Sequence, residues 1–265
     1  MANSNVRISF GLGQWFQRLW SAMFLAGQAV WHLVKLQLNY PNTLNQCLSV
    51  GPGSLVISLI TAAFVGMVFT IQVAREFIYF GAGEAVGGVL ALALTRELAP
   101  VLTAVVLAGR VGSAFAAEIG TMRVTEQIDA LYILKTDPID YLVMPRMIAC
   151  CVMLPILTLL SLITGLAGGF VIATQLYDIA SSVFLDSIQT FMGLWDIVSA
   201  LLKAVVFGAL VAVIGCNWGL TTTGGAKGVG QSTTTAVVTA LLAIFIANFF
   251  LSWLMFQGPG QAITG

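Results

Sequence analysis

The chain has 265 residues, of which 58% are hydrophobic and only 8% charged, and its acidic and basic residues balance to a net charge of zero. Soluble domains carry about 25% charged residues, so this composition excludes a water-soluble fold and indicates an integral membrane protein. A chain without net positive charge also lacks the electrostatic footprint of a nucleic-acid-binding protein.

The region before the first long apolar run predicts a helix that does not cross the membrane. Residues 10–40 are apolar but interrupted by Arg18, His32 and Lys35, so no uncharged stretch there reaches the roughly 20 residues that span a bilayer. The tryptophans of this region favour the headgroup level, which indicates an interfacial helix lying in the membrane plane; an additional span is the alternative. The two prolines and two glycines of 41–53 predict a break in the chain.

Five runs with few or no charges are long enough to cross the membrane as helices. They are residues 54–74, 86–117, 147–177, 197–220 and 232–256. The expected fold class is therefore an all-α membrane protein with an N-terminal interfacial helix and five transmembrane helices. We expect residues 1–50 to form an N-terminal cytosolic and interfacial region, and residues 51–265 to form the membrane domain.

The second of these spans is unusual because it contains Arg96, Glu97 and Arg110. Charge inside the hydrocarbon layer is costly and normally faces a partner or a wet cavity. Arg96 and Glu97 lie about 32 Å from the inner end of the span at 1.5 Å per residue, near the far edge of the layer, whereas Arg110 lies in the near leaflet. We expect the three residues to bind substrate. An Arg–Glu pair that locks helices together is the alternative, and the two roles are compatible.

Residues 118–146 form a charged island between the second and third spans. Apolar residues recur within it at helical spacing: Val124, Ile128, Leu131 and Leu134. This pattern predicts a short amphipathic helix over 121–135. Thr121 is the expected N-cap, and Asp137 cannot continue the helix because it precedes Pro138. We interpret the segment as a cytosolic helix that contacts another protein; a solvated connecting loop is the alternative.

The distribution of basic residues predicts the orientation of the chain. With the N-terminus inside, the inner segments hold seven of the eleven basic residues, whereas the outer segments offer only Arg75 and Lys203. The charged island is therefore expected in the cytosol, and the loop 178–196, which has three aspartates, outside. No cleavable targeting signal is recognised, which favours the inner membrane of a bacterium with an outer membrane over a plastid inner envelope.

The sequence predicts neither a catalytic site nor a metal or cofactor site. The single histidine, His32, would be the only obvious base of a lipid-modifying enzyme, and the four cysteines include no CxxC pair. The glycine-rich run TTTGGAKGVGQ is not a phosphate-binding loop, because Lys227 is followed by glycine rather than by Ser or Thr. We expect that any energy for transport comes from another chain or from an ion gradient.

Two runs of the sequence closely resemble the MlaE/YrbE family: LALTRELAPVLTAVVLAGRVGSAFAAEIGTMRVTEQIDAL and DPIDYLVMPR. Members of this family are permease subunits of lipid-transporting ABC systems that work with MCE-domain proteins. The resemblance covers the chain from Ser54 onward. It implies a homodimer in which each subunit has an interfacial helix and five spans, and it implies a separate ABC ATPase and an MCE-domain protein as partners.

The resemblance also implies roles for particular residues. The helix 121–135 would be a coupling helix that docks into a groove on the ATPase. Its expected contacts are Val124, Glu126, Ile128, Asp129 and Leu131. The family's TREL segment, here 95–98, would line a lipid pocket toward the outer side, where Arg96 could pair with a lipid phosphate and Glu97 could hold Arg96 or a neighbouring helix.

The expected function is that of the permease subunit of an ATP-driven phospholipid transporter, which moves lipid between the inner membrane and an MCE-domain shuttle. A secondary, ion-coupled transporter that uses Glu97 as its titrating group is the alternative. An odd number of spans and the lack of a visible internal repeat argue against that alternative.

Overall fold

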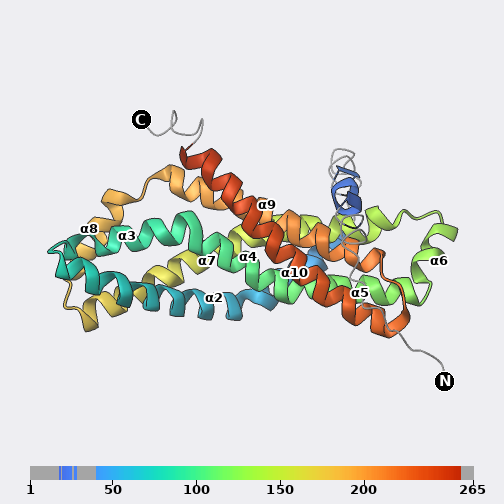
Figure 1. Ribbon diagram of the computed structural model, residues 1–265. Helices are drawn as coiled ribbons and strands as arrows, with labels where there is room; N and C mark the ends of the chain where they lie inside the picture. Colours follow the sequence, from blue (N-terminus) through green and yellow to red (C-terminus); the bar gives the residue numbers. More distant parts are fainter. Residues whose placement is uncertain (1–17, 19, 26, 29–39, 258–265) are drawn as a thin grey trace, which may run out of the picture.

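The computed structural model describes residues 18, 20–25, 27–28 and 40–257, and every regular element in that part of the chain is helical. Five helices there are long and apolar enough to cross a membrane: α2 (Tyr40–Tyr79), the composite helix α3 to α5 (Gly83–Val124), α7 with the turn before it (Ile139–Leu176), α9 (Leu194–Leu220), and α10 with the turn after it (Gly225–Phe256). The predicted all-α membrane fold and its five spans are therefore confirmed. The helices form an elongated bundle with α6 (Gln127–Ile133) at one end and α8 (Ser181–Phe191) at the other (Figure 1).

The predicted interfacial helix lies mostly outside the described residues, as does His32. The described residues 18, 20–25 and 27–28 are helical. They meet the end of α9, where Asn217 Nδ2 donates to the carbonyl oxygen of Arg18 at 2.9 Å and Ser21 Oγ bonds to Asn217 Oδ1 at 3.0 Å. The position of this segment in the membrane plane stays a prediction.

The helix α2 is continuous over 40 residues, so the predicted break at 41–53 is wrong. Pro41 occupies the first turn, where the missing N–H would have no intrahelical acceptor. Pro52 lies deeper in the helix and removes one backbone hydrogen bond. Arg110 supports the helix beyond this point, because its Nη1 donates to Ser54 Oγ at 2.7 Å. Tertiary contacts thus outweigh the local tendency of a proline to end a helix. The expected boundary between residues 50 and 51 also lies within α2.

The second membrane helix consists of three α-helical segments joined by two π-helical turns. The segments are α3 (Val86–Ala93), α4 (Ala99–Leu107) and α5 (Ser113–Val124), and the turns are Leu94–Leu98 and Ala108–Gly112. A π turn bonds a backbone N–H to the carbonyl five residues back and is frequent at functional sites. The first turn carries Arg96 and Glu97, and the second carries Arg110. All three charged residues of the predicted span therefore lie where the helix is locally unwound.

The helices α2 and α7 (Met144–Leu176) pack closely because small residues face each other. The buried face of α2 includes Ser54, Ser58, Ala62, Gly66, Thr70 and Ala74, at intervals of four. A Cβ at Gly66 would overlap the carbonyl oxygen of Gly165 on α7, and one at Gly168 would lie 2.6 Å from the carbonyl oxygen of Ala63. Such small-residue stripes let backbones approach in a bilayer, where van der Waals contact contributes much of the association energy.

The helix α9 lies in the middle of the bundle and α10 lies on its outside. In the most apolar 18 residues of each membrane helix, 56% are buried in α9 but only 17% in α10. A Cβ at Gly219 of α9 would lie 2.7 Å from Cβ of Ile119, so α9 and α5 are nearly in backbone contact. The outer face of α10 carries large apolar side chains, among them Phe245 and Phe249. This face is available to lipid or to a second subunit.

The predicted aspartate loop between the third and fourth spans contains the helix α8, which the sequence analysis did not predict. Phe184 of α8 is fully buried, and the N–H of Gly88 donates to Ser187 Oγ at 2.8 Å. Gly87 and Gly88 leave room for aromatic rings of α8, because a Cβ at Gly88 would lie 2.5 Å from the ring of Phe191. The helix α8 therefore ties the loop to α3, just before the charged π turn.

Within the charged island, residues 121–135 belong to two helices rather than to the single helix predicted there. The helix α5 continues from the second span to Val124, so Thr121 lies inside a helix and is not an N-cap. Glu126 then adopts φ 61°, in the left-handed region, and α6 follows over only seven residues. A second left-handed residue, Lys135 with φ 56°, lies just beyond α6. A short helix does lie between the second and third spans, but its predicted bounds and cap are wrong.

Candidate functional site

Arg96 and Glu97 lie on the first π turn, next to a proline that changes the backbone hydrogen bonds. Pro100 has no N–H to donate to the carbonyl of Arg96, four residues earlier. The ammonium of Lys203 on α9 takes this place, with Nζ 2.6 Å from the Arg96 carbonyl oxygen. A buried carbonyl without a donor would cost free energy. The lysine of the fourth span therefore compensates for the proline of the second.

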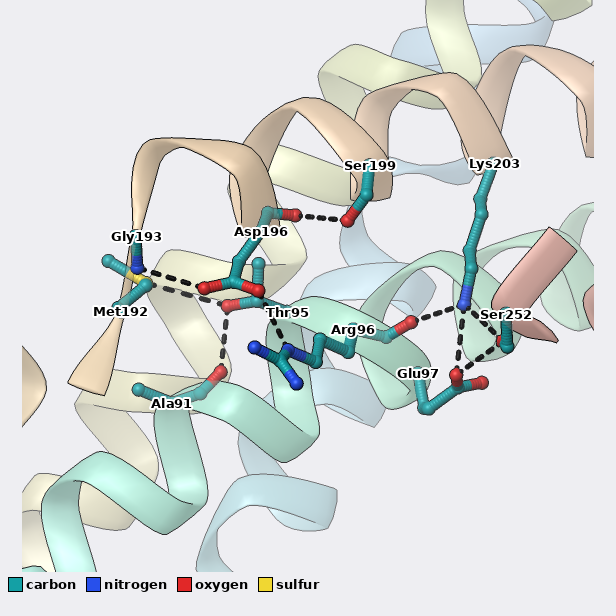
Figure 2. A network of polar contacts seen from close by, with 10 residues as sticks. All are labelled: Ala91, Thr95, Arg96, Glu97, Met192, Gly193, Asp196, Ser199, Lys203 and Ser252. Carbon is teal, nitrogen blue, oxygen red and sulfur yellow. Dashed lines mark hydrogen bonds and ion pairs between the residues drawn. The ribbon is translucent and has the colours of Figure 1, made fainter. Parts of the chain in front are cut away.

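The side chains of Arg96 and Glu97 diverge, and each pairs with a charged residue of α9 (Figure 2). Arg96 Nε donates to Asp196 Oδ1 at 2.7 Å, and Lys203 Nζ donates to Glu97 Oε1 at 2.9 Å. Two ion pairs between helices thus replace the Arg–Glu pair considered from the sequence. Asp196 and Lys203 are both buried, and a buried charge requires a partner of opposite sign. The four charges sum to zero.

Asp196 also forms the N-terminal cap of α9. Its Oδ2 accepts a hydrogen bond from the N–H of Gly193 at 2.8 Å, and its Oδ1 accepts from Arg96. A carboxylate in the first turn is further stabilised by the helix dipole. Both oxygens of a side chain that is only 6% exposed are therefore satisfied, and the start of α9 is fixed relative to Arg96.

Glu97 links the π turn to α10 as well as to α9. The hydroxyl of Ser252 donates to Oε1 and the amide of Asn248 donates to Oε2, each at 2.6 Å. Ser252 Oγ in turn accepts from Lys203 Nζ at 2.7 Å. Glu97 thus accepts three hydrogen bonds from side chains, and both of its oxygens are engaged. We call these six residues the cross-helix network: Arg96, Glu97, Asp196, Lys203, Asn248 and Ser252.

An open pocket of about 580 Å³ lies against the cross-helix network. Its lining residues come from α3, the π turn and the end of α10: Val89, Leu92, Ala93, Arg96, Glu97, Phe249, Ser252, Trp253 and Phe256. Small-molecule sites usually measure about 300–1,000 Å³ and combine apolar walls with a few polar groups. This pocket has both properties, since its walls are aliphatic and aromatic and its charged groups lie together.

Arg96 presents unpaired donors to the pocket. The Phe256 ring lies over its guanidinium, with 4.5 Å between Cζ and the ring centroid. The Arg96 side chain is still 40% exposed, and only its Nε donates to another described residue. The two terminal nitrogens are therefore free to bind a ligand, and their planar arrangement suits the oxygens of a phosphate or carboxylate.

The third predicted substrate residue, Arg110, is not part of this pocket. It lies 14 residues after Arg96 on the same membrane helix, roughly 21 Å away at 1.5 Å per residue. Its guanidinium contacts α2 instead, at Ser54, and occupies the space beside Gly53, where a Cβ would lie 2.5 Å from Nη2. Arg96 and Glu97 therefore both line the pocket, whereas Arg110 lies in a contact between two membrane helices.

The five predicted ATPase contacts do not share one surface. Three of them are exposed: Val124, Glu126 and Asp129. Ile128 is only 2% exposed and Leu131 is half-buried, and both pack against the main apolar core. Of the apolar stripe recognised by its helical spacing, Ile128 and Leu131 thus face into the protein, whereas Val124 and Leu134 are exposed.

A different set of apolar residues is exposed at the end of α6. Tyr132, Ile133 and Leu134 are 61%, 83% and 73% exposed, and we call them the α6 tip. The sequence analysis assigned Leu134 to the same stripe as Ile128 and did not single out Tyr132 or Ile133. The end of α6 explains why Leu134 leaves the stripe, because the helix stops at Ile133 and Leu134 no longer has helical backbone angles (φ −76°, ψ 5°).

Several residues of the site were not predicted as site residues: Asp196, Lys203, Asn248, Ser252 and Phe256. Two of them carry a signal in the sequence, since Lys203 is the only charged residue of the predicted fourth span and Asn248 is a polar residue within the fifth. Intramembrane polar residues normally pair with one another, so the charges of different spans could have been matched. In the described part of the chain, no three His, Cys, Asp or Glu side chains gather as a metal site would require.

Comparison with known proteins identifies a family. The family described as Permease MlaE matches residues 43–254. A Synechocystis protein named as a probable ABC transporter permease protein is 69% identical over 254 residues, covering 96% of this chain and 97% of that protein. The chloroplastic protein trigalactosyldiacylglycerol 1 of Arabidopsis thaliana is 52% identical over 243 residues, covering 92% and 69%. A probable ABC transporter permease protein of Rickettsia prowazekii is 42% identical, covering 86% and 88%.

Proposed function

Because this chain belongs to the MlaE permease family, we propose that it is the membrane subunit of an ATP-driven transporter of phospholipids. The observation that carries the proposal is the pocket beside the first π turn, which joins an apolar and aromatic wall to a guanidinium with free N–H groups. A phospholipid has the matching parts, with acyl chains for the wall and a phosphate for the guanidinium. A relative named for trigalactosyldiacylglycerol, a lipid that carries sugar in place of phosphate, supports a lipid substrate in general.

The proposed binding mode gives different tasks to Arg96 and Glu97. Arg96 donates to a phosphate oxygen through its terminal nitrogens, while its Nε remains bonded to Asp196. Glu97 already accepts hydrogen bonds from Lys203, Asn248 and Ser252, so it holds α9 and α10 around the pocket rather than binding the lipid directly. Apolar acyl chains lie along the wall formed by α3 and α10.

The energy for transport is proposed to enter through α6, at the end of the bundle opposite α8 (Figure 1). The exposed α6 tip offers an apolar contact to a separate ABC ATPase. Ile128, packed in the core, transmits a displacement of α6 to the membrane helices. Arg146 on α7 bonds to Glu118 on α5 at 2.8 Å, which joins the second and third membrane helices near the same end. Movement of α6 would then tilt both helices and change the pocket.

The assembly and location follow the same proposal. A homodimer is proposed, and the exposed outer face of α10 is a surface of the required apolar character. An MCE-domain protein is proposed to exchange lipid with the pocket on the outer side. The bacterial relatives support the inner membrane of a bacterium with an outer membrane, and the chloroplastic relative supports a plastid inner envelope as the alternative.

The lipid-binding part is tested by purifying the full chain in mild detergent and identifying bound proteins and lipids by mass spectrometry. Arg96→Gln is expected to lose most of the bound phospholipid, whereas Arg110→Gln, which removes an intramembrane arginine outside the pocket, is expected to keep it. Equal lipid content in both variants would refute the assignment of the pocket. Ion-driven lipid movement by this chain alone in liposomes would favour the secondary transporter instead.

The coupling part is tested at the α6 tip. Ile133→Asp is expected to insert and to bind lipid normally but to lose the co-purifying ATPase, because a charge replaces an apolar contact. Gln231→Asp introduces the same charge at an exposed position of α10 and is expected to retain the ATPase. Retention of the ATPase by Ile133→Asp would refute the proposed contact.

A further inference from the structure

Phe256 has a place in the pocket that its apolar character alone does not explain. It lies in the π turn Trp253–Gln257 at the end of α10, and its side chain is half-buried. Its ring centroid lies 4.5 Å from Cζ of Arg96 and 5.7 Å from Nζ of Lys203. The face of an aromatic ring attracts cations, so one ring contacts both positive charges of the cross-helix network.

The contacts of Arg96 with described residues leave its terminal nitrogens open to a ligand. Asp196 binds Nε at 2.7 Å, and Cζ of the guanidinium lies over the Phe256 ring, 4.5 Å from its centroid. Hydrogen-bond acceptors bind a guanidinium in its own plane, along the N–H directions, whereas aromatic rings stack on its face. The ring and a phosphate oxygen can therefore bind Arg96 at the same time. Asp196 and Phe256 thus contact the guanidinium at two points and leave its two terminal nitrogens without a partner among the described residues.

The described residues that line the pocket have no comparable group to offer a cation. Glu97 accepts hydrogen bonds from Lys203, Ser252 and Asn248, and both oxygens of Asp196 are engaged. Among the described residues that line the pocket, the hydrogen-bonding capacity left over thus consists largely of the donors of Arg96. Recognition of a lipid headgroup at this point depends on its anionic oxygens, which makes the orientation of Arg96 decisive.

Building on the proposed lipid transport, we infer that Phe256 is a positioning residue that holds Arg96 in the plane required to bind a phosphate oxygen. Phe256 thereby sets the preference of the pocket for a phospholipid over an uncharged lipid with the same acyl chains. Without the ring, Asp196 still holds Nε, but the guanidinium can rotate about the side-chain torsions and loses a contact that is partly shielded from solvent.

The test compares two lipids in the full-length chain reconstituted in nanodiscs. The probes are phosphatidylglycerol and diacylglycerol that carry the same fluorescent acyl chain, and the readout is the ratio of their dissociation constants. Phe256→Leu is expected to reduce the preference for phosphatidylglycerol by about 5- to 30-fold, the range that a partly desolvated cation–π contact supports. Phe256→Trp is expected to keep the wild-type preference for phosphatidylglycerol, because the larger ring also stacks on a guanidinium.

Phe249→Leu is the matched control, since Phe249 lines the same pocket but makes no ring contact with Arg96 among the described residues. It is expected to weaken both probes equally and to leave their ratio unchanged. Any of three results overturns the inference. Phe256→Leu keeps the wild-type ratio, Phe249→Leu lowers the ratio as much as Phe256→Leu does, or Phe256→Trp lowers the ratio as Phe256→Leu does. If Phe256→Leu does not fold, Phe256→Met takes its place in the comparison, because methionine also removes the aromatic ring.

The Arg96→Gln variant separates this inference from the proposed function. If Arg96→Gln removes the preference and Phe256→Leu does not, phosphate binding stands and the role of Phe256 is wrong. If the wild-type chain binds phosphatidylglycerol no better than diacylglycerol, the proposed recognition of phospholipid fails, and the inference fails with it.

Discussion

Replacing Lys203 with methionine is expected to destabilise the protein strongly. Methionine keeps the apolar stem but removes an ammonium that donates to the Arg96 carbonyl at 2.6 Å, to Ser252 Oγ at 2.7 Å and to Glu97 Oε1 at 2.9 Å. Removal of one partner from a buried ion pair costs roughly 3–5 kcal/mol. Glu97 is 42% exposed, whereas Lys203 is fully buried, and Glu97 keeps two other donors. The expected cost in free energy of unfolding is therefore near the lower limit, about 3 kcal/mol.

The assay is thermal unfolding of the full chain in mild detergent. A loss of this size is expected to lower the melting temperature by roughly 6–12 °C in a chain of this length. Lys227→Met is the control, because Lys227 is exposed and its removal breaks no buried pair. The double variant Lys203→Met with Glu97→Gln removes both charges, and it is expected to recover on the order of 1–3 kcal/mol relative to the sum of the single losses. Strict additivity, or a Lys203→Met variant that melts with the wild type, would refute this reasoning.

Two further comparisons use the same assay. Gly66→Ala is expected to cost more than about 2 kcal/mol, because the new Cβ overlaps the carbonyl oxygen of Gly165. Gly230→Ala, with no atom within 4 Å, is expected to be neutral or to gain up to about 1 kcal/mol; equal melting temperatures for the two variants would contradict the close packing of α2 on α7. Arg146→Met is expected to cost roughly 1.5–3 kcal/mol, because it removes a buried guanidinium that donates to the Leu142 carbonyl and to Glu118, whose carboxylate is 56% exposed and stays solvated. Arg123→Met breaks an exposed pair and is expected to cost less than about 1 kcal/mol. The opposite order of these two losses would show that burial does not govern them.

The exposed face of α10 and the α6 tip illustrate how far burial can be inferred from apolar character. In a soluble protein, residues such as Phe249 and Ile133 would be expected in the core. In this chain both are exposed. Phe249 lies on a membrane helix, where lipid is as apolar as a protein interior and small residues are the ones that let helices approach, whereas Ile133 belongs to the α6 tip, for which we propose a contact with another protein. Apolar periodicity therefore indicates which segments enter the membrane, but it is a weak guide to which side of a helix meets its neighbours.

The sequence by itself determined the number of membrane helices and the presence of a short helix between the second and third. These features are local, because a chain in hydrocarbon must satisfy its backbone hydrogen bonds within each segment, and only a long apolar helix does so. The sequence also identified Arg96 and Glu97, because any charge within an apolar run is conspicuous.

Only the tertiary structure decided what those charges contact. Arg96 pairs with Asp196 and Glu97 with Lys203, about a hundred residues later in the chain, and the periodicity of one helix does not specify which other helix lies against it. Tertiary contacts also kept α2 continuous through Pro52, where local propensity predicts an end. Pairing between helices depends on the packing of all five at once, and for that reason it could not be inferred from any single segment.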